Sequence, residues 1–343
     1  MTEPQTTAAP PTRLIVIGAS AGGLQPLRTV IEALPAQLAA TVLVVVHVSA
    51  TGTSVLPHIL SRAGTLRVET AQDGLALRPG QLTVAPPDRH LVVEDGHVRL
   101  LRGARENGHR PAIDPLFRSA AEGYGAACCG VLLSGARDDG TAGLAEVKRH
   151  GGVALVQEPQ EAQYGDMPAN AIAGAAVDAV LPAAAIGPAL VRLVAGSGTM
   201  LERSSGRRAS DAADGVVLTI TCPECGGVMT ERNRGGALQF ACHVGHLYSP
   251  RSMLSAHAED VERAMWTAAR TLQDRATLLR RMAERARSTG NERTARQFEV
   301  SALEAVDQAA TIRVAIVSLD DAALPTGDTD THTHVPAHEE ATG

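Results

Sequence analysis

The sequence predicts an α/β protein built on a doubly wound, mostly parallel sheet with an antiparallel hairpin insertion, followed by two smaller parts. Apolar, strand-like segments alternate with helical segments over the first half of the chain, a pattern typical of parallel strands joined by helical crossovers. A stretch rich in Ser, Gly, Arg and Asp then precedes a cysteine-rich segment and two long helical segments. A chain of 343 residues is long enough for more than one domain.

Composition restricts the class of protein. Aromatic residues make up only 2% of the chain, so Ala, Val and Leu must supply most of the core. The net charge of -6 argues against a nucleic-acid-binding protein. No apolar run approaches the roughly 20 residues that cross a bilayer, and segment 1–11 lacks the apolar stretch of a signal peptide. We therefore expect a soluble, cytoplasmic protein with no membrane insertion.

The first strand and the turn after it are the most informative stretch. Residues 14–17 are apolar and mostly β-branched, and only small residues follow from Gly18 to Gly23 before a helix begins near Leu24. Ser20 therefore lies in a strand-to-helix turn, beside backbone N–H groups that favour an anion. Such a turn suits either a glycine-rich phosphate site or a nucleophilic serine whose oxyanion those N–H groups stabilise.

The remaining elements of the first half follow in order. A second strand covers residues 41–48, with His47 near its end, and residues 73–101 form short strands with hairpin-like turns. Residues 102–111 are polar and predict a surface loop. We expect further strands at 66–69, 131–133, 153–157 and 179–181. We expect helices at 24–34, 55–61 and 114–122, another that follows the loop 134–140 and ends at residue 150, and one within 164–172.

Candidate catalytic side chains follow three of the predicted strands. Ser20, His47 and the pair Asp138 and Asp139 each stand at a carboxyl end, and these ends share one edge of a parallel sheet. A hydroxyl, an imidazole and a carboxylate are the parts of a nucleophile, its general base and the group that orients the base. Taken singly, they are equally typical of a turn serine, a strand-end histidine and a helix N-cap. The spacing does not distinguish Asp138 from Asp139.

Several motifs within residues 12–195 resemble the CheB-type chemotaxis protein-glutamate methylesterases. They are, in order, Gly18–Gly23, the strand that ends at His47, Ala85–His90, His109–Phe117, Leu133–Gly140 and Gly165–Pro168. The resemblance implies that Ser20 is the nucleophile, His47 the base and Asp139 the carboxylate of a Ser-His-Asp triad. It also implies hydrolysis of glutamate methyl esters on receptor helices with release of methanol, deamidation of glutamine, and no cofactor for catalysis.

The resemblance extends to residues around the triad. In the family a methionine contributes a backbone N–H to the oxyanion hole, and Ala136 at that position can supply the same group. Ala21, Arg110 and Met167 complete the expected oxyanion and substrate residues. The phosphate-site alternative loses support, because His47 stands where a ribose would require an acidic residue. Since about a dozen residues precede the first strand, we expect no receiver domain before it within this chain.

A separate cysteine and histidine pattern predicts a zinc site. Cys222, Cys225, Cys242 and His246 are separated by two, sixteen and three residues. Paired ligands at such spacings are typical of structural zinc, with His243 as the less favoured fourth ligand. Four protein ligands leave no open position for substrate, so we expect a structural zinc ion.

The last part of the chain predicts a helical hairpin. Segments 254–287 and 293–319 have helical periodicity, and in the first of them we expect the contact stripe to be Leu254, Val261, Met265, Leu272, Leu279 and Met282. The expected layout is a catalytic domain at 12–195, a linker at 196–217, a zinc-ribbon-like module at 218–250, a helical hairpin at 251–320 and a disordered tail at 321–343. The hairpin is expected to dock a partner or to self-associate, and the substrate to be a methylated receptor or other signalling protein. The alternative is a non-catalytic signalling adaptor that binds partners through its zinc module and helices.

Overall fold

The structure, a computed structural model, describes residues 13–48, 54–196, 216–234 and 237–321. Nearly all of the predicted linker 196–217 and of the predicted tail 321–343 lies outside these residues. The chain divides into two units, residues 1–257 and residues 258–343.

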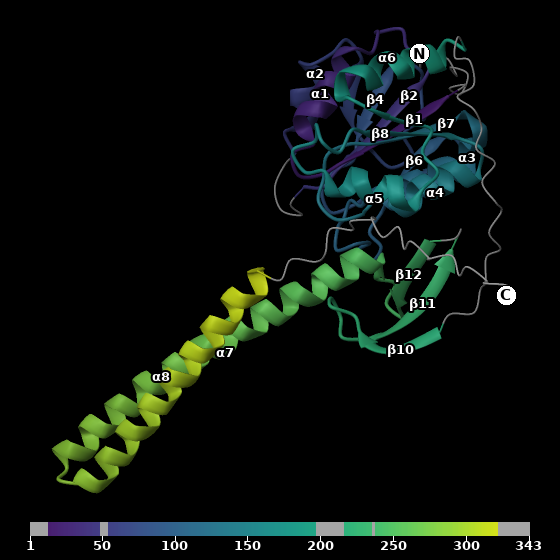
Figure 1. The fold of residues 1–343 in the computed structure, drawn as a ribbon. Coiled ribbons are helices and arrows are strands. Elements are labelled where there is room, and N and C mark those ends of the chain that lie inside the picture. Colours follow the sequence, from purple (N-terminus) through teal and green to yellow (C-terminus); the bar gives the residue numbers. More distant parts are fainter. Residues whose placement is uncertain (1–12, 49–53, 197–215, 235–236, 322–343) are drawn as a thin grey trace, which may run out of the picture. The chain divides into compact units, whose positions relative to one another are not determined.

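A seven-stranded parallel sheet forms the centre of the first unit (Figure 1). Its strands, in spatial order, are β3 (Arg67–Thr70), β4 (Gln81–Val84), β2 (Thr41–Val46), β1 (Leu14–Ala19), β7 (Cys128–Leu132), β8 (Val153–Gln157) and β9 (Ala179–Leu181). The central strand β1 is buried along its whole length. Continuous apolar runs suit such strands because helices cover both faces of a parallel sheet.

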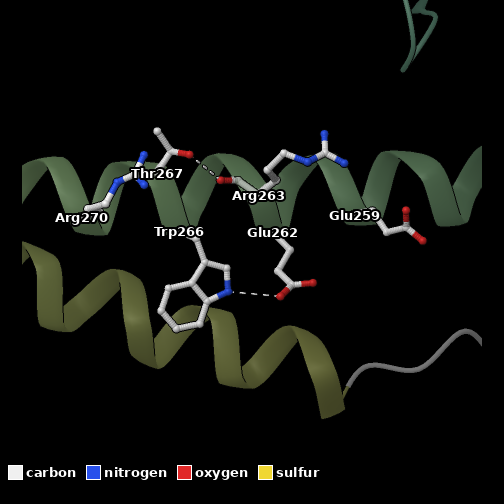
Figure 2. A pocket seen from close by; sticks show the side chains of 6 residues that line it. All are labelled: Glu259, Glu262, Arg263, Trp266, Thr267 and Arg270. Atoms are coloured by element: carbon white, nitrogen blue, oxygen red, sulfur yellow. Dashed lines mark hydrogen bonds between the residues drawn. The ribbon is translucent and has the colours of Figure 1, made fainter. Parts of the chain in front are cut away.

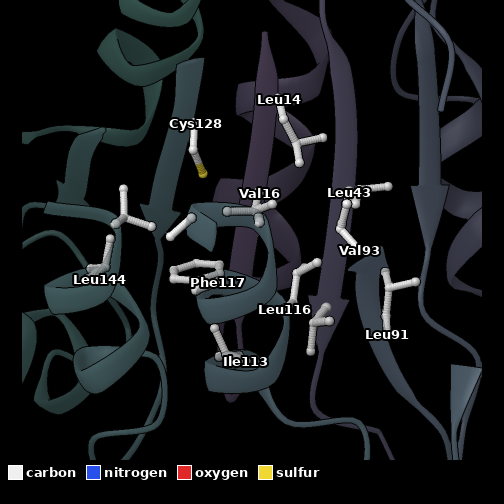
Figure 3. Close-up of a cluster of buried hydrophobic side chains, with 14 of the residues drawn as sticks. Leu14, Val16, Leu43, Leu91, Val93, Ile113, Leu116, Phe117, Cys128 and Leu144 are labelled. Atoms are coloured by element: carbon white, nitrogen blue, oxygen red, sulfur yellow. The ribbon is translucent and has the colours of Figure 1, made fainter. Parts of the chain in front are cut away.

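Alternate residues of β1 contribute to two separate cores. Leu14 and Val16 pack on one face of the sheet, where Phe117 is fully buried, and Figure 3 shows this cluster. Ile15 and Ile17 pack on the opposite face. The helices that contribute to the first core are α3 (Ile113–Tyr124), α4 (Thr141–Arg149) and α5 (Asp166–Gly174), and those of the second are α1 (Leu24–Glu32), α2 (Leu56–Ser61) and α6 (Ala183–Val194). The predicted doubly wound fold is therefore confirmed.

The hairpin insertion is confirmed in part. Strands β5 (His90–Glu94) and β6 (His97–Leu101) form an antiparallel hairpin whose apolar residues join the first core. Strand β4, however, pairs in parallel with β2 and β3, so the expectation that residues 73–101 form only hairpin-like strands is wrong for Gln81–Val84. Four residues are too few for periodicity to separate a hairpin arm from a buried parallel strand.

A second, antiparallel sheet follows in the first unit. Its strands are β10 (Val216–Thr221), β11 (Val228–Arg234), β12 (Ala237–Cys242) and β13 (Leu247–Tyr248). Met229, Tyr248 and Met253 are nearly inaccessible and form its small core together with two cysteines. Strand β10 begins two residues before the predicted start of the module.

Helices α7 (Pro250–Ser288) and α8 (Glu292–Asp321) form the predicted helical hairpin, but not all of the predicted stripe lies in its contact. Leu254, Val261 and Met282 are exposed. Fully buried alanines recur every seven residues instead, at Ala269, Ala276 and Ala283 of α7 and at Ala295, Ala302 and Ala309 of α8. A seven-residue repeat of small side chains lets two helices approach closely.

A shallow hollow on α7 carries the only tryptophan of the chain (Figure 2). It is lined by Glu259, Glu262, Arg263, Trp266, Thr267 and Arg270. The Trp266 indole donates a hydrogen bond to Glu262 at 3.1 Å and is half exposed. Among the residues that the structure describes, no helix combines the length and the apolar character needed to cross a membrane.

Candidate active site

The turn between β1 and α1 holds Ser20 through backbone contacts with the loop after β7. The Ser20 N–H donates to the Ser134 carbonyl at 3.0 Å, and the Ser20 carbonyl accepts from the Gly23 N–H at 3.0 Å. The Ser134 hydroxyl donates to the Ala21 carbonyl at 2.9 Å. Gly22 has a φ of +68°, a left-handed conformation that suits glycine in so tight a turn. Ser20 is thus fixed directly before the start of a helix.

The structure brings Ser20, His47 and Asp139 into one hydrogen-bonded series. The His47 Nδ1 atom lies 3.0 Å from the Ser20 hydroxyl oxygen, and Nε2 lies 2.7 Å from Asp139 Oδ2. The His47 backbone N–H donates to the Ala19 carbonyl at 3.1 Å, which fixes the end of β2 beside the end of β1. The side chains of His47 and Asp139 are only 7% and 2% exposed.

The donors around Asp139 determine which nitrogen of His47 carries the proton. A carboxylate only accepts hydrogen bonds, so Nε2 donates to Asp139 and Nδ1 is left with a lone pair toward the Ser20 hydroxyl. Burial alone would raise the pKa of Asp139, but hydrogen bonds from the His47 ring and the Ile113 N–H outweigh it and hold this pKa below its usual range. Asp139 is therefore ionised near neutral pH, and His47 can accept the proton of Ser20.

Asp139 and Asp114 cap each other's helices. Asp139 binds the start of α3, which carries Asp114, and Asp114 binds the start of α4, which follows Asp139. Asp139, just before α4, accepts the N–H groups of Ile113 and Asp114 at the start of α3, at 2.7 and 3.3 Å. Asp114, in the first turn of α3, accepts the N–H groups of Gly140 and Gly143 at the start of α4, at 3.0 and 2.7 Å. Burial and the nearby Asp139 carboxylate raise the pKa of Asp114. This reciprocal capping fixes the position of Asp139 before any substrate binds.

Two residues that sequence analysis did not single out for the site lie against the series. The His109 ring stacks on the His47 ring, with centroids 3.6 Å apart and an angle of 14° between the planes. Burial and the neighbouring His47 lower the pKa of His109 to about 3, so the stacked ring is neutral. The Asn107 side-chain NH2 donates to Asp139 Oδ1 at 2.9 Å and to Asp114 Oδ2 at 3.0 Å. His109 was visible only as part of the family-like motif, and no pattern in the sequence indicated Asn107.

Of the two expected oxyanion residues, Ala21 directly follows Ser20 in the turn, and Ala136 lies in the loop between β7 and α4. In the described part of the chain, the backbone N–H groups of Ala21 and Ala136 have no hydrogen-bond acceptor. Ala136 follows Gly135, where an added Cβ would lie 2.9 Å from the Ser20 Cβ. The absence of a side chain at Gly135 thus allows this backbone to approach Ser20 closely.

Arg110 is held by hydrogen bonds, and Met167 is held by packing. The Arg110 Nε atom donates to Asp88 Oδ1 at 2.9 Å, and Nη1 donates to the Gly103 carbonyl at 2.6 Å. Met167 is fully buried, and its side chain fills the space where a Cβ on Gly135 would lie. Met167 thus supports the Gly135 backbone by packing.

The neighbouring Asp138 faces a different part of the molecule. Its Oδ1 atom accepts the hydroxyl groups of Ser249 and Ser252 at 2.6 and 2.7 Å. The two adjacent aspartates thus point to different partners, and only Asp139 contacts His47.

Cys222, Cys225, Cys242 and His246 are gathered at one end of the second sheet. Their ligand atoms all lie within 4.8 Å of one another. Three of these separations are 3.5 to 3.6 Å, between Cys222 and His246, Cys225 and Cys242, and Cys242 and His246. Zn–S and Zn–N bonds of about 2.3 and 2.1 Å place tetrahedral ligand atoms about 3.6–3.8 Å apart, so the residues fit a zinc ion. The His243 ring packs against Gly227 instead.

Comparison with known proteins identifies the first half of the chain. Residues 15–190 match the CheB methylesterase family. The chain belongs to this family. A Leptospira interrogans protein, provisionally named as a protein-glutamate methylesterase/protein-glutamine glutaminase, is 37% identical over 180 residues, 52% of this chain and 93% of that protein.

A solved structure and a second relative agree with this family membership. The Thermotoga maritima CheB methylesterase catalytic domain aligns with a TM-score of 0.51 and 34% identity, covering 53% of this chain and 98% of that one. An Anaeromyxobacter dehalogenans protein-glutamate methylesterase/protein-glutamine glutaminase is 40% identical over 195 residues, which span 57% of its own length. The CheB match contains Ser20, His47 and Asp139, whereas the cysteine cluster and the helical hairpin lie beyond it.

Proposed function

We propose that this chain is a serine hydrolase that removes methyl esters from glutamate side chains of receptor-like signalling proteins. The observation that carries the proposal is the hydrogen-bonded series Ser20, His47 and Asp139, at a helix start in a CheB methylesterase fold. Two relatives are named for both methylesterase and glutaminase activity, so deamidation of glutamine side chains is a second reaction of the same site. A carboxamide and a methyl ester both present a carbonyl carbon to the same nucleophile.

In the acylation step, Ser20 Oγ attacks the ester carbonyl carbon while its proton moves to His47 Nδ1. Asp139 keeps the imidazole in the tautomer that can accept this proton and stabilises the imidazolium that forms. The carbonyl oxygen becomes an oxyanion, for which the N–H groups of Ala21 and Ala136 are the available donors. Collapse of the tetrahedral intermediate breaks the C–O bond, and the leaving methoxy group takes the proton from His47 to give methanol.

In the deacylation step, water replaces the alcohol. His47 accepts a proton from the water as its oxygen attacks the glutamyl-Ser20 ester, and the same two N–H groups hold the second oxyanion. Ser20 leaves and recovers its proton from His47, so the products are a glutamate side chain and the free enzyme. With a glutamine substrate, ammonia replaces methanol as the first product.

We also propose that Cys222, Cys225, Cys242 and His246 bind one structural zinc ion. The ligand separations fit a tetrahedral site, and all four positions are filled by protein. The metal would order the short loops that carry the ligands, and it has no role in bond breaking. Cytoplasmic location and self-association through the helical hairpin remain predictions from the sequence.

Release of methanol from receptor-containing membranes methylated with a radioactive methyl group tests the activity. Wild-type protein is expected to release volatile radioactivity, and Ser20→Ala to release none above background. Ser61→Ala, which removes a hydroxyl from the exposed end of α2, is the matched control and should retain the wild-type rate.

Covalent labelling by a fluorophosphonate, which reacts with activated serines, separates the two parts of the proposal. Labelling of Ser20 without methanol release would refute the substrate and leave the hydrolase. Absence of both would refute the enzyme and favour the adaptor alternative.

A further inference from the structure

The second sheet of the first unit pairs directly with the loop that carries Asn107 and His109. The Asn107 N–H donates to the Leu247 carbonyl at 2.7 Å, and the Leu247 N–H donates to the Arg105 carbonyl at 3.3 Å. Leu247 thus forms a parallel bridge with Glu106. Strand β13 therefore acts as a backbone support for a loop whose side chains reach the catalytic series.

The Asn107 side chain continues this contact to the catalytic carboxylate. Its Oδ1 atom accepts the Ser249 N–H at 2.8 Å, while its NH2 group donates to Asp139 and Asp114. Asn107 is only 3% exposed, so water cannot readily replace these partners. One amide group thereby joins the backbone after β13 to the residue that orients His47.

The chemistry of the partners requires an amide at this position. On one side Asn107 meets two carboxylates, which need donors, and on the other a backbone N–H, which needs an acceptor. Asn has both groups, whereas an aspartate would add a third carboxyl and an alanine would remove the hydrogen bond that each of the three partners makes to this side chain. The φ of 53° at Asn107 is a conformation that asparagine tolerates better than most side chains.

In the sequence, the metal-ligand cluster lies next to the strand that contacts Asn107. His246 immediately precedes Leu247, and the His246 carbonyl accepts the Cys242 N–H at 3.0 Å. Cys242 ends β12, whose Phe240 and Ala241 pair with β13. A metal ion bound by Cys242 and His246 would therefore fix the residues from which β13 begins.

We propose that Asn107 is a positioning residue for Asp139, and that metal binding at Cys222, Cys225, Cys242 and His246 sets its position through β13. The zinc module is then a functional part of the hydrolase rather than an independent appendage. This inference rests on the proposed hydrolase function, since it concerns the activation of Ser20.

The test measures three quantities on the full-length chain. They are the rate at which a fluorophosphonate labels Ser20, kcat and KM for methanol release, and the zinc content of the purified protein. The variants are Asn107→Ala, Cys222→Ser and the double variant. Glu224→Gln is the matched control, because it removes an exposed ion pair at 3.3 Å between the cysteine-rich segment and Arg105 of the same loop, without altering Asn107.

Asn107→Ala is expected to keep its zinc while labelling and kcat fall about 10- to 100-fold, the factor that one hydrogen bond to a charged group is worth. KM should change less than about twofold, because the lost contact acts on the nucleophile and not on substrate binding. Cys222→Ser should lose zinc and show a similar fall. The double variant should be no slower than the slower single variant, since both changes break the same connection. Retained zinc in Asn107→Ala also shows that the module is folded in that variant.

Several outcomes would overturn the inference. Wild-type labelling in Asn107→Ala, wild-type labelling in the zinc-free Cys222→Ser variant, or effects that multiply in the double variant would each show that the module and the triad are independent. A fall in Glu224→Gln as large as in Asn107→Ala would assign the effect to general loosening of the contact. If the wild-type Ser20 does not react at all, the proposed function fails first, which distinguishes the two failures.

Discussion

Asp139→Asn is the substitution that tests the geometry of the site most directly. The four groups around the Asp139 carboxylate all donate hydrogen bonds: His47 Nε2 at 2.7 Å, Ile113 N at 2.7 Å, Asn107 Nδ2 at 2.9 Å and Asp114 N at 3.3 Å. An asparagine has one oxygen and one NH2 group. In either orientation its NH2 group therefore faces two donors, and a buried mismatch results.

The orientation decides which property suffers more. With the NH2 group toward His47, the imidazole must turn to the Nδ1–H tautomer and can no longer accept the Ser20 proton. The equivalent change in serine-protease triads lowers kcat about 10,000-fold. With the NH2 group toward Asn107 and the Asp114 N–H, the variant loses about 1–3 kcal/mol of unfolding free energy through unpaired buried donors.

The pH dependence of stability supplies a second measurement. Because the pKa of Asp139 is lowered in the folded state, its ionised form stabilises the protein above the unfolded-state pKa near 3.8, and that contribution is lost as the pH falls below this value. The difference in unfolding free energy between wild type and Asp139→Asn should therefore shrink as the pH falls from 5 toward 3. Urea unfolding at several pH values measures it.

Asp138→Asn is the matched control for this prediction. It removes the same charge one residue away, and its retained Oδ1 atom can still accept both serine hydroxyls. We expect kcat for methanol release within about threefold of wild type. A kcat of Asp139→Asn within tenfold of wild type, or equal losses in the two variants, would refute the assignment of Asp139 as the orienting carboxylate.

Three further predictions concern the surroundings of the site and the hairpin. Lowering the pH from 7 to 5 should cost wild type at most about 2 kcal/mol through His109, because the unfolded imidazole binds a proton near pH 6.5 and the folded one only near pH 3. His109→Phe should lack this loss in urea unfolding, and equal pH dependence in both proteins would contradict the buried stack. Gly135→Ala should lower the rate of methanol release at least about tenfold, since its Cβ would press on Ser20. Gly103→Ala, with open space around the added Cβ, should keep the wild-type rate. Similar rates in the two variants would show that the close approach of the Gly135 backbone to Ser20 is unnecessary. Ala276→Leu should destabilise the helical hairpin by about 1–3 kcal/mol, because the larger side chain overpacks the row of buried alanines. Leu278→Ala, at an exposed position, should change the unfolding free energy by less than about 0.5 kcal/mol. Unfolding is followed through Trp266 fluorescence, and the reverse order of the two effects would exclude packing through the alanines.

The sequence predicted the sheet because its strands are continuous apolar runs at regular intervals. Ser20 and His47 could be placed at one edge for the same reason, since topology alone brings carboxyl ends of parallel strands together. Asn107 could not be found in this way, because its role depends on contacts with Ser249, 142 residues later in the chain. The segment 102–111 reads as a polar surface loop, and nothing in its composition shows that two of its side chains are held against the triad.

The hairpin shows a related limit of periodicity. The spacing of large apolar residues predicted a contact stripe that includes Leu254, Val261 and Met282, yet these side chains are exposed. The side chains that are fully buried at this spacing are alanines, whose small size gives a weak hydropathy signal but allows tight packing. Seven-residue spacings occur both in the predicted apolar stripe and among the buried alanines. The predicted repeat was therefore right, but the predicted contact face of the helix was only partly right.

Asp138 and Asp139 show why the choice between neighbouring carboxylates required three-dimensional information. Arg137, with a φ of 67°, turns the chain before them, and its carbonyl accepts the Asn170 amide at 2.7 Å. From this fixed point Asp139 is directed to His47 and the start of α3, while Asp138 is directed to the hydroxyl groups of Ser249 and Ser252 at the start of α7. The same short loop thus contacts both the triad and the segment that follows the cysteine cluster. A displacement of that segment would act on Asp138 directly and on Asp139 through Asn107, and Ser249 takes part in both contacts, through its hydroxyl to Asp138 and its N–H to Asn107.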